Sequence, residues 1–116
     1  MAARRMFSRE ILESDAFLSL SFEAQCLYVQ MSLSADDSGF SASPRRICRI
    51  GGIDESCIDE LVNAGFIFRF DSGVVVILDW YRCNSIKPDR FKPTIFQSEL
   101  SQLELDETKR YVVLET

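Results

Sequence analysis

Arginines and lysines gather at three places in the sequence, and clusters of such side chains are suited to binding the phosphates of DNA. They occur near the N-terminus, in residues 45–49 and in residues 87–92. The chain as a whole has a formal net charge of -5, so its overall field does not attract nucleic acid and any cationic surface must be local. The candidate DNA-binding residues are Arg4, Arg5, Arg9, Arg45, Arg46, Arg49, Lys87, Arg90 and Lys92.

The arginines of residues 45–49 form the best-defined cluster. In an α-helix, which turns by about 100° per residue, Arg45, Arg46 and Arg49 fall within one arc of about 100°. Three guanidinium groups on one face favour contacts with a phosphate backbone. An alternative remains open, in which this face is a solvated surface whose arginines pair with the acidic residues of 54–59.

The cysteines and the absence of histidine argue against a structural metal. Cys26, Cys48, Cys57 and Cys83 contain no CxxC pair, and without histidine the common mixed zinc sites cannot be assembled. The first three of these cysteines lie beside apolar residues within predicted helices. We therefore expect them to be small core residues, and we expect no disulfide.

No set of residues in the sequence suggests catalysis. There is no histidine, no glycine-rich loop of the GxxxxGK type and no cysteine partnered by a base, so we expect neither an enzyme nor a cofactor. Asp36 and Asp37 are adjacent acids without further ligands at a suitable spacing. They favour a turn or a cap over a metal site.

The composition is that of a soluble globular protein. Hydrophobic residues make up 47% and charged residues 27% of the 116 residues, which suits one folded domain with a single core. The opening segment lacks the apolar stretch of a secretion signal, and no later segment is apolar enough to span a bilayer. A cytoplasmic protein without membrane contact is expected.

The elements that would position the arginines are marked by local signals. Ser43 followed by Pro44 predicts the start of a helix, and Gly51-Gly52 predicts its end. In order, the predicted elements are a helix over 22–33, a short strand over 39–41, helices over 44–50 and 54–63, and strands over 66–70 and 74–78. This order is typical of a winged helix-turn-helix.

We therefore expect an α+β, mostly helical fold with a winged helix-turn-helix at its core. Residues 1–116 would form a single domain, with its core over about 21–80. The flanking parts would be an N-terminal helical extension (1–20) and a C-terminal basic segment and helix (81–116), the helix covering 94–105 and a further strand covering 111–114.

The predicted helix over 22–33 is apolar on two opposite faces. Because both faces must be covered, one should pack on the domain core and the other on a further segment or another chain. The N-terminal segment is the expected cover, and a subunit interface in a homo-oligomer is the alternative. The two stripes are Ala24, Leu27, Tyr28 and Met31, and Phe22, Cys26, Val29 and Leu33.

Several short segments carry a resemblance to a known family. They are Arg4-Arg5-Met6, Glu13-Ser14-Asp15-Ala16-Phe17, Ala24-Gln25-Cys26-Leu27-Tyr28, Ala35-Asp36-Asp37-Ser38-Gly39-Phe40, Phe70-Asp71-Ser72-Gly73-Val74-Val75-Val76-Ile77 and Asp89-Arg90-Phe91-Lys92-Pro93-Thr94-Ile95. In them the chain resembles the N-terminal winged-helix domain of phage and prophage replisome-organiser proteins of Gram-positive bacteria, related in role to DnaD-like replication initiation proteins. It departs from that pattern at Ser21, where proline is usual, and at Pro88, where a basic residue is common. The resemblance implies binding of origin DNA and recruitment of the replicative helicase or its loader.

The second helix of the predicted helix-turn-helix has an acidic exposed side. Its outward positions are Glu55, Ser56, Asp59, Glu60 and Asn63. Carboxylates there would face DNA phosphates, so we do not expect this helix to dock in the major groove in the ordinary way. Two hypotheses remain: DNA is held by residues 45–49 and the segments around Arg5 and Arg90, or the winged helix is a protein-interaction and oligomerisation surface without direct DNA binding.

Overall fold

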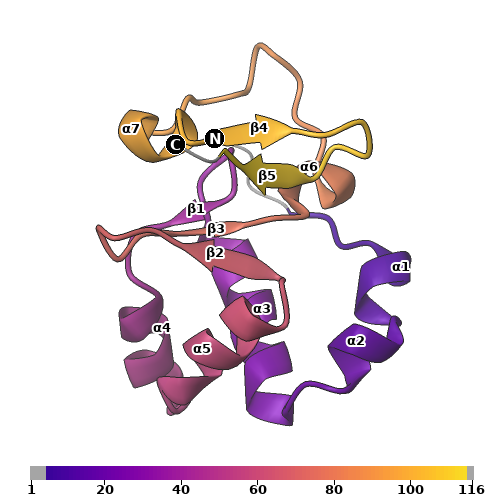
Figure 1. Cartoon of the computed structure of the whole chain (residues 1–116), viewed down its shortest axis with the longest axis vertical. Helices are drawn as coiled ribbons and strands as arrows, with labels where there is room; N and C mark the ends of the chain where they lie inside the picture. Colours follow the sequence, from indigo (N-terminus) through magenta and orange to yellow (C-terminus); the bar gives the residue numbers. More distant parts are fainter. Residues whose placement is uncertain (1–4, 115–116) are drawn as a thin grey trace.

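A three-stranded antiparallel sheet lies between a layer of helices and a second, two-stranded sheet (Figure 1). The computed structural model describes residues 5–114. The helices are α1 (Arg9–Leu12), α2 (Asp15–Leu18), α3 (Phe22–Ser34), α4 (Pro44–Gly51), α5 (Ser56–Asn63), α6 (Trp80–Cys83) and α7 (Gln97–Leu100). The strands are β1 (Phe40–Ser41), β2 (Ile67–Arg69), β3 (Val75–Ile77), β4 (Leu103–Leu105) and β5 (Tyr111–Val113). Because α3, α4 and α5 cover one side of the first sheet and the β4–β5 hairpin lies on the other, the central strand β3 is buried along its whole length.

The segment from α3 to β3 has the predicted order of elements. Its strands pair antiparallel in the order β1-β3-β2, so that Val76 lies between Phe40 and Phe68. Gly52 adopts a left-handed φ of 68° directly after α4, and this turn directs the chain into α5. Both α4 and α5 pack on α3. The predicted strands are confirmed in position but are shorter than expected.

The N-terminal segment packs on the core instead of covering the second stripe of α3. Phe17 meets Tyr28 and Phe66 edge-on, with ring centroids 5.4 and 5.6 Å apart. Tyr28 belongs to the face of α3 that packs on the core, so α1 and α2 lie on the side of that face. The expectation that this segment covers the second stripe is therefore wrong, and Phe22 and Leu33 remain 83% and 52% exposed.

The cysteines divide between core and surface. Cys48 on α4 and Cys57 on α5 are buried, which confirms the prediction for these two residues. Cys26 is exposed on α3, so the prediction that it is a core residue is wrong. Its place in the outward stripe of α3 explains the difference. All four cysteines are free.

The expectation of a helix over residues 94–105 is wrong for most of that range, and the end of the range belongs to a second hairpin. Only α7 is helical, and β4 pairs antiparallel with β5, which confirms the strand expected near the C-terminus. The turn between them is held by Asp106, whose carboxylate accepts hydrogen bonds from the Thr108 hydroxyl (2.6 Å) and the Arg110 backbone (3.0 Å). These contacts favour a hairpin over the continuation of a helix.

Candidate nucleic-acid interface

The arginines of α4 form an exposed cationic face. Pro44 begins the helix and is buried together with Cys48, which fixes the opposite side of α4 against the core. Arg45, Arg46 and Arg49 are all exposed, as the helical spacing predicts. In the described part of the chain, no ion pair involves any of these three guanidinium groups. The alternative in which they pair with acids of residues 54–59 is therefore not what the structure shows.

Those neighbouring acids have other partners. The Asp59 carboxylate pairs with Arg69 on β2 at 2.6 Å. Glu60 accepts hydrogen bonds from the backbone N–H and the hydroxyl of Ser21, both at 2.7 Å. Ser21 in turn caps α3, so these two acids of α5 serve the structure of the domain. A serine directly before a helical pattern could have indicated the cap, but no local signal identifies its partner 39 residues away.

Glu60→Gln is expected to lower the melting temperature at neutral pH and to lose that effect in acid. The hydrogen bonds from the Ser21 backbone and hydroxyl hold the pKa of Glu60 below its ordinary value. Because the folded-state pKa is the lower one, the stabilisation is present above the ordinary glutamate pKa of about 4.3 and is lost as the pH falls through the folded value. Melting curves of the wild type and the variant should converge at the acid end.

The control for this pH series is Glu107→Gln. Glu107 is exposed in the turn between β4 and β5. Its replacement should leave the melting temperature unchanged at neutral pH. If the melting temperatures of Glu60→Gln and the wild type differed as much at about pH 3 as at neutral pH, the role assigned to the charge of Glu60 would be contradicted.

The N-terminal cationic cluster does not form a DNA-binding surface with α4. The side chain of Arg5 is only 2% exposed, and its guanidinium lies 5.1 Å from the centroid of the Trp80 ring. It donates hydrogen bonds to the backbone oxygen of Ala35 (2.7 Å) and to Asp37 (3.3 Å). The prediction that Arg5 contacts DNA is therefore wrong, because its side chain is buried and makes its contacts within the fold. Arg4 lies outside the described residues.

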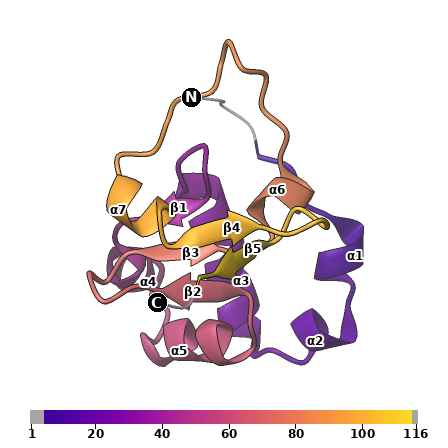
Figure 2. The ribbon, with the colours of Figure 1, turned by 45° about the horizontal axis from the view of Figure 1, so that its top comes forward.

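Arg9 and the basic residues of 87–92 are exposed but lie elsewhere. Arg9 pairs with Glu13 on the surface of α1 at 3.3 Å. Lys87, Arg90 and Lys92 belong to the long loop between α6 and α7, which stands at the end of the molecule opposite to α4 (Figures 1 and 2). The structure thus separates the α4 arginines from this loop and does not join them into one surface.

The adjacent acids Asp36 and Asp37 hold the flanking segments in place, which confirms the prediction of a turn. Asp36 accepts hydrogen bonds from the backbone N–H groups of Ser38 and Phe40 and from the hydroxyl of Thr94. Asp37 is fully buried, and besides pairing with Arg5 it accepts the backbone N–H of Lys92 at 3.0 Å. Arg5 and the loop residues Lys92 and Thr94 are therefore attached to this turn.

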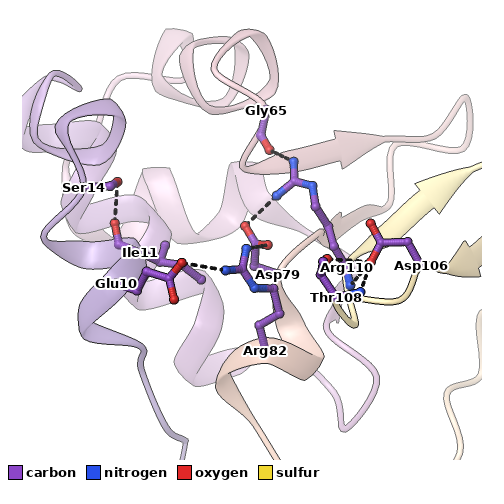
Figure 3. A network of polar contacts seen from close by, with 9 residues as sticks. All are labelled: Glu10, Ile11, Ser14, Gly65, Asp79, Arg82, Asp106, Thr108 and Arg110. Atoms are coloured by element: carbon purple, nitrogen blue, oxygen red, sulfur yellow. Dashed lines mark hydrogen bonds and ion pairs between the residues drawn. The ribbon is translucent and has the colours of Figure 1, made fainter.

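A second polar network neutralises two further arginines (Figure 3). The Asp79 carboxylate is buried and pairs with Arg82 at 3.0 Å and with Arg110 at 2.6 Å. Arg110 also donates to the backbone oxygen of Gly65, and Arg82 also pairs with Glu10. These contacts join α1, α6, the β4–β5 turn and the end of α5. The guanidinium groups of Arg82 and Arg110 make contacts within the domain and do not add to the cationic face of α4.

Other kinds of site find no support in residues 5–114. No group of three or more cysteine, aspartate or glutamate side chains in this range could hold a metal ion. No helix in the same range is long and apolar enough to cross a membrane. No protein-family model, no curated protein and no solved structure matches the chain.

Proposed function

We propose that the chain is a winged-helix module that binds the DNA backbone through α4, within a replication initiator of the phage or prophage replisome-organiser type. The order α3, β1, α4, α5, β2, β3 and the sheet order β1-β3-β2 support the winged-helix assignment. The replication context, a cytoplasmic location and the recruitment of a helicase or its loader rest on the family resemblance.

The observation that carries this proposal is the unpaired cationic face of α4. Arg45, Arg46 and Arg49 are exposed, lie within one arc of the helix and have no carboxylate partner in the described chain. Each can approach a phosphate without first breaking an ion pair. Glu55, directly before the neighbouring helix α5, and Asp59 on that helix are both exposed, so contact of α5 with the bases is disfavoured. The binding should therefore be weak and independent of sequence.

Charge reversal on α4 is expected to abolish binding of duplex DNA. Three phosphate contacts should make the logarithm of affinity fall with the logarithm of salt concentration with a slope of about -2.7. Replacing Arg45→Glu and Arg46→Glu removes two contacts and adds repulsion, so affinity should fall by about 100-fold. Fluorescence anisotropy with a labelled duplex, at low and moderate salt, measures both quantities.

A matched control changes the net charge equally at the other end of the molecule. The double variant Lys87→Glu, Arg90→Glu alters the exposed loop between α6 and α7 and leaves α4 intact. Its affinity for DNA should stay within about 3-fold of the wild type if the α4 face is the binding surface, apart from long-range effects. Equal losses in the two double variants, or no loss in the α4 variant, would contradict the proposal.

A second candidate function is assembly with another protein chain without direct DNA binding. The observation that favours it is the outward stripe of α3, where Phe22 is 83% exposed and Leu33 is 52% exposed. Large apolar side chains on one face of a helix mark an interaction surface more often than a solvated one. Both functions are compatible with a replisome organiser.

A further inference from the structure

We infer that the outward stripe of α3 is a homodimer interface, in which the α3 helices of two copies of this chain pack antiparallel. The stripe consists of Phe22, Cys26, Val29 and Leu33. Phe22, Cys26 and Leu33 are exposed and Val29 is half-buried. This inference rests on the second candidate function and not on DNA binding.

The spacing of the stripe is that of a helix–helix seam. Its residues follow one another at intervals of four, three and four, which is the alternation of the apolar positions in a heptad. The opposite face of α3, which packs on the core, uses Ala24, Leu27, Tyr28 and Met31. All four residues of the seam thus belong to α3, and none of them lies on the face that packs on the core.

The stripe is complementary to itself when the second helix runs in the opposite direction. Four, three and four is the same series from either end, so a single register places Phe22 opposite Leu33 of the second copy and Cys26 opposite Val29. Each contact then pairs a larger with a smaller side chain. A two-fold interface requires one surface that fits its own copy, and this property indicates a second copy of the chain as the occupant.

The charges favour the same arrangement. The chain has a net charge of -5, but among the thirteen residues of α3 the only aspartate, glutamate, lysine or arginine is Glu23. Two acidic molecules therefore meet here with little repulsion. Antiparallel packing places the two copies of Glu23 about 14 Å apart along the helix axis, so their mutual repulsion is small.

The size of the stripe predicts a weak dimer. One largely exposed phenylalanine and three smaller side chains offer roughly 400 Å² per partner, about half of the ~800 Å² found in stable complexes. The expected dissociation constant therefore lies in the range of about 10–100 μM. Sedimentation equilibrium over a concentration series without DNA measures it directly.

Acidic substitutions in the stripe test the interface without disturbing the core. The double variant Phe22→Glu, Leu33→Glu should raise the dissociation constant by at least about 10-fold, because it replaces exposed apolar contacts by like charges. The matched control is Ile95→Glu, since Ile95 is 82% exposed in the loop between α6 and α7. Its dissociation constant should stay within about 2-fold of the wild type. A wild type that remains monomeric at about 1 mM, or equal effects of the stripe variant and the control, would overturn the inference.

A disulfide between the wild type and a double variant tests the direction of helix packing. Wild type carries the exposed Cys26 thiol, and the double variant Cys26→Ser, Val29→Cys carries one at the position opposite to it. Under mild oxidation the antiparallel register predicts a covalent dimer in the mixture and little in either protein alone, because like positions lie about one turn apart. Efficient cross-linking of wild type alone would indicate parallel packing and would contradict the proposed register. The absence of DNA from both experiments keeps their outcome separate from that of the anisotropy titration.

Discussion

Gly39→Ala is expected to destabilise the domain strongly, because position 39 has no room for a side chain. A Cβ atom at position 39 would lie 2.6 Å from Cγ and 2.7 Å from Cβ of Trp80. Trp80 is 1% exposed, and its indole N–H donates to the backbone oxygen of Asp37 at 2.9 Å, so the ring cannot move away without breaking that bond. Gly39 also has a φ of +91°, which costs an alanine about 1–2 kcal/mol.

The clash and the backbone strain together should lower the free energy of unfolding by about 3 kcal/mol or more. For a chain of this size that corresponds to a fall in melting temperature of about 10 °C. Urea denaturation followed by circular dichroism gives the free energy, and the fluorescence of the single tryptophan reports the same transition.

Gly73→Ala is the matched control, because Gly73 has a φ of +90° and a Cβ there would meet nothing within 4 Å. It carries the backbone strain without the clash, so it should cost only about 1–2 kcal/mol. If the two substitutions were equally destabilising, the close approach of Gly39 to Trp80 would have no energetic weight.

The parts of the fold that were predicted correctly depend on short-range signals. Ser43 and Pro44 begin α4, Gly52 ends it, and Gly73 lies in the hairpin between β2 and β3. Proline fixes φ at the start of a helix and glycine permits a positive φ at a turn, so these effects can be inferred without knowledge of the rest of the chain. The common face of the α4 arginines was predictable for the same reason, since it follows from the period of a single helix.

The parts that were missed depend on contacts between distant segments. Arg5 follows another arginine and has the local character of a surface residue, yet its partner Asp37 lies 32 residues further on. Similarly, the apolar residues of 94–105 fit a helical period, but Leu103–Leu105 is too short for its period to distinguish a strand from a helix. Its pairing with Tyr111–Val113 decides the outcome.

The distance between the basic clusters, like the contacts of Arg5, could not be predicted from the sequence. The sequence indicates that residues 45–49 and 87–92 are cationic, but their distance in space depends on how the loop after α6 crosses the molecule. The hydrogen bonds of Asp36 to Thr94 and of Asp37 to the Lys92 backbone fix the far end of that loop to the turn before β1. The loop therefore stands away from α4, and only the α4 cluster is left as a compact site.

Asp37→Asn is expected to have the second large effect on stability. The Asp37 carboxylate is fully buried and faces the Arg5 guanidinium, which is itself 2% exposed. Removing the negative charge takes this carboxylate away from a buried guanidinium, and the loss of one partner of a buried ion pair costs about 3–5 kcal/mol. The control is Asp89→Asn in the exposed loop, which should change the free energy of unfolding by less than about 0.5 kcal/mol.

Replacing both members of the pair separates the cost of burying a guanidinium that lacks the Asp37 carboxylate from the value of the contact. The double variant Arg5→Met, Asp37→Leu removes both charges and offers an apolar side chain to the Trp80 ring, so it should be more stable than Asp37→Asn alone. Full recovery is not expected, because the backbone N–H of Lys92 would still lose its acceptor. Urea denaturation of both variants measures the difference. A double variant less stable than Asp37→Asn would contradict the view that the buried charge dominates the contribution of Asp37.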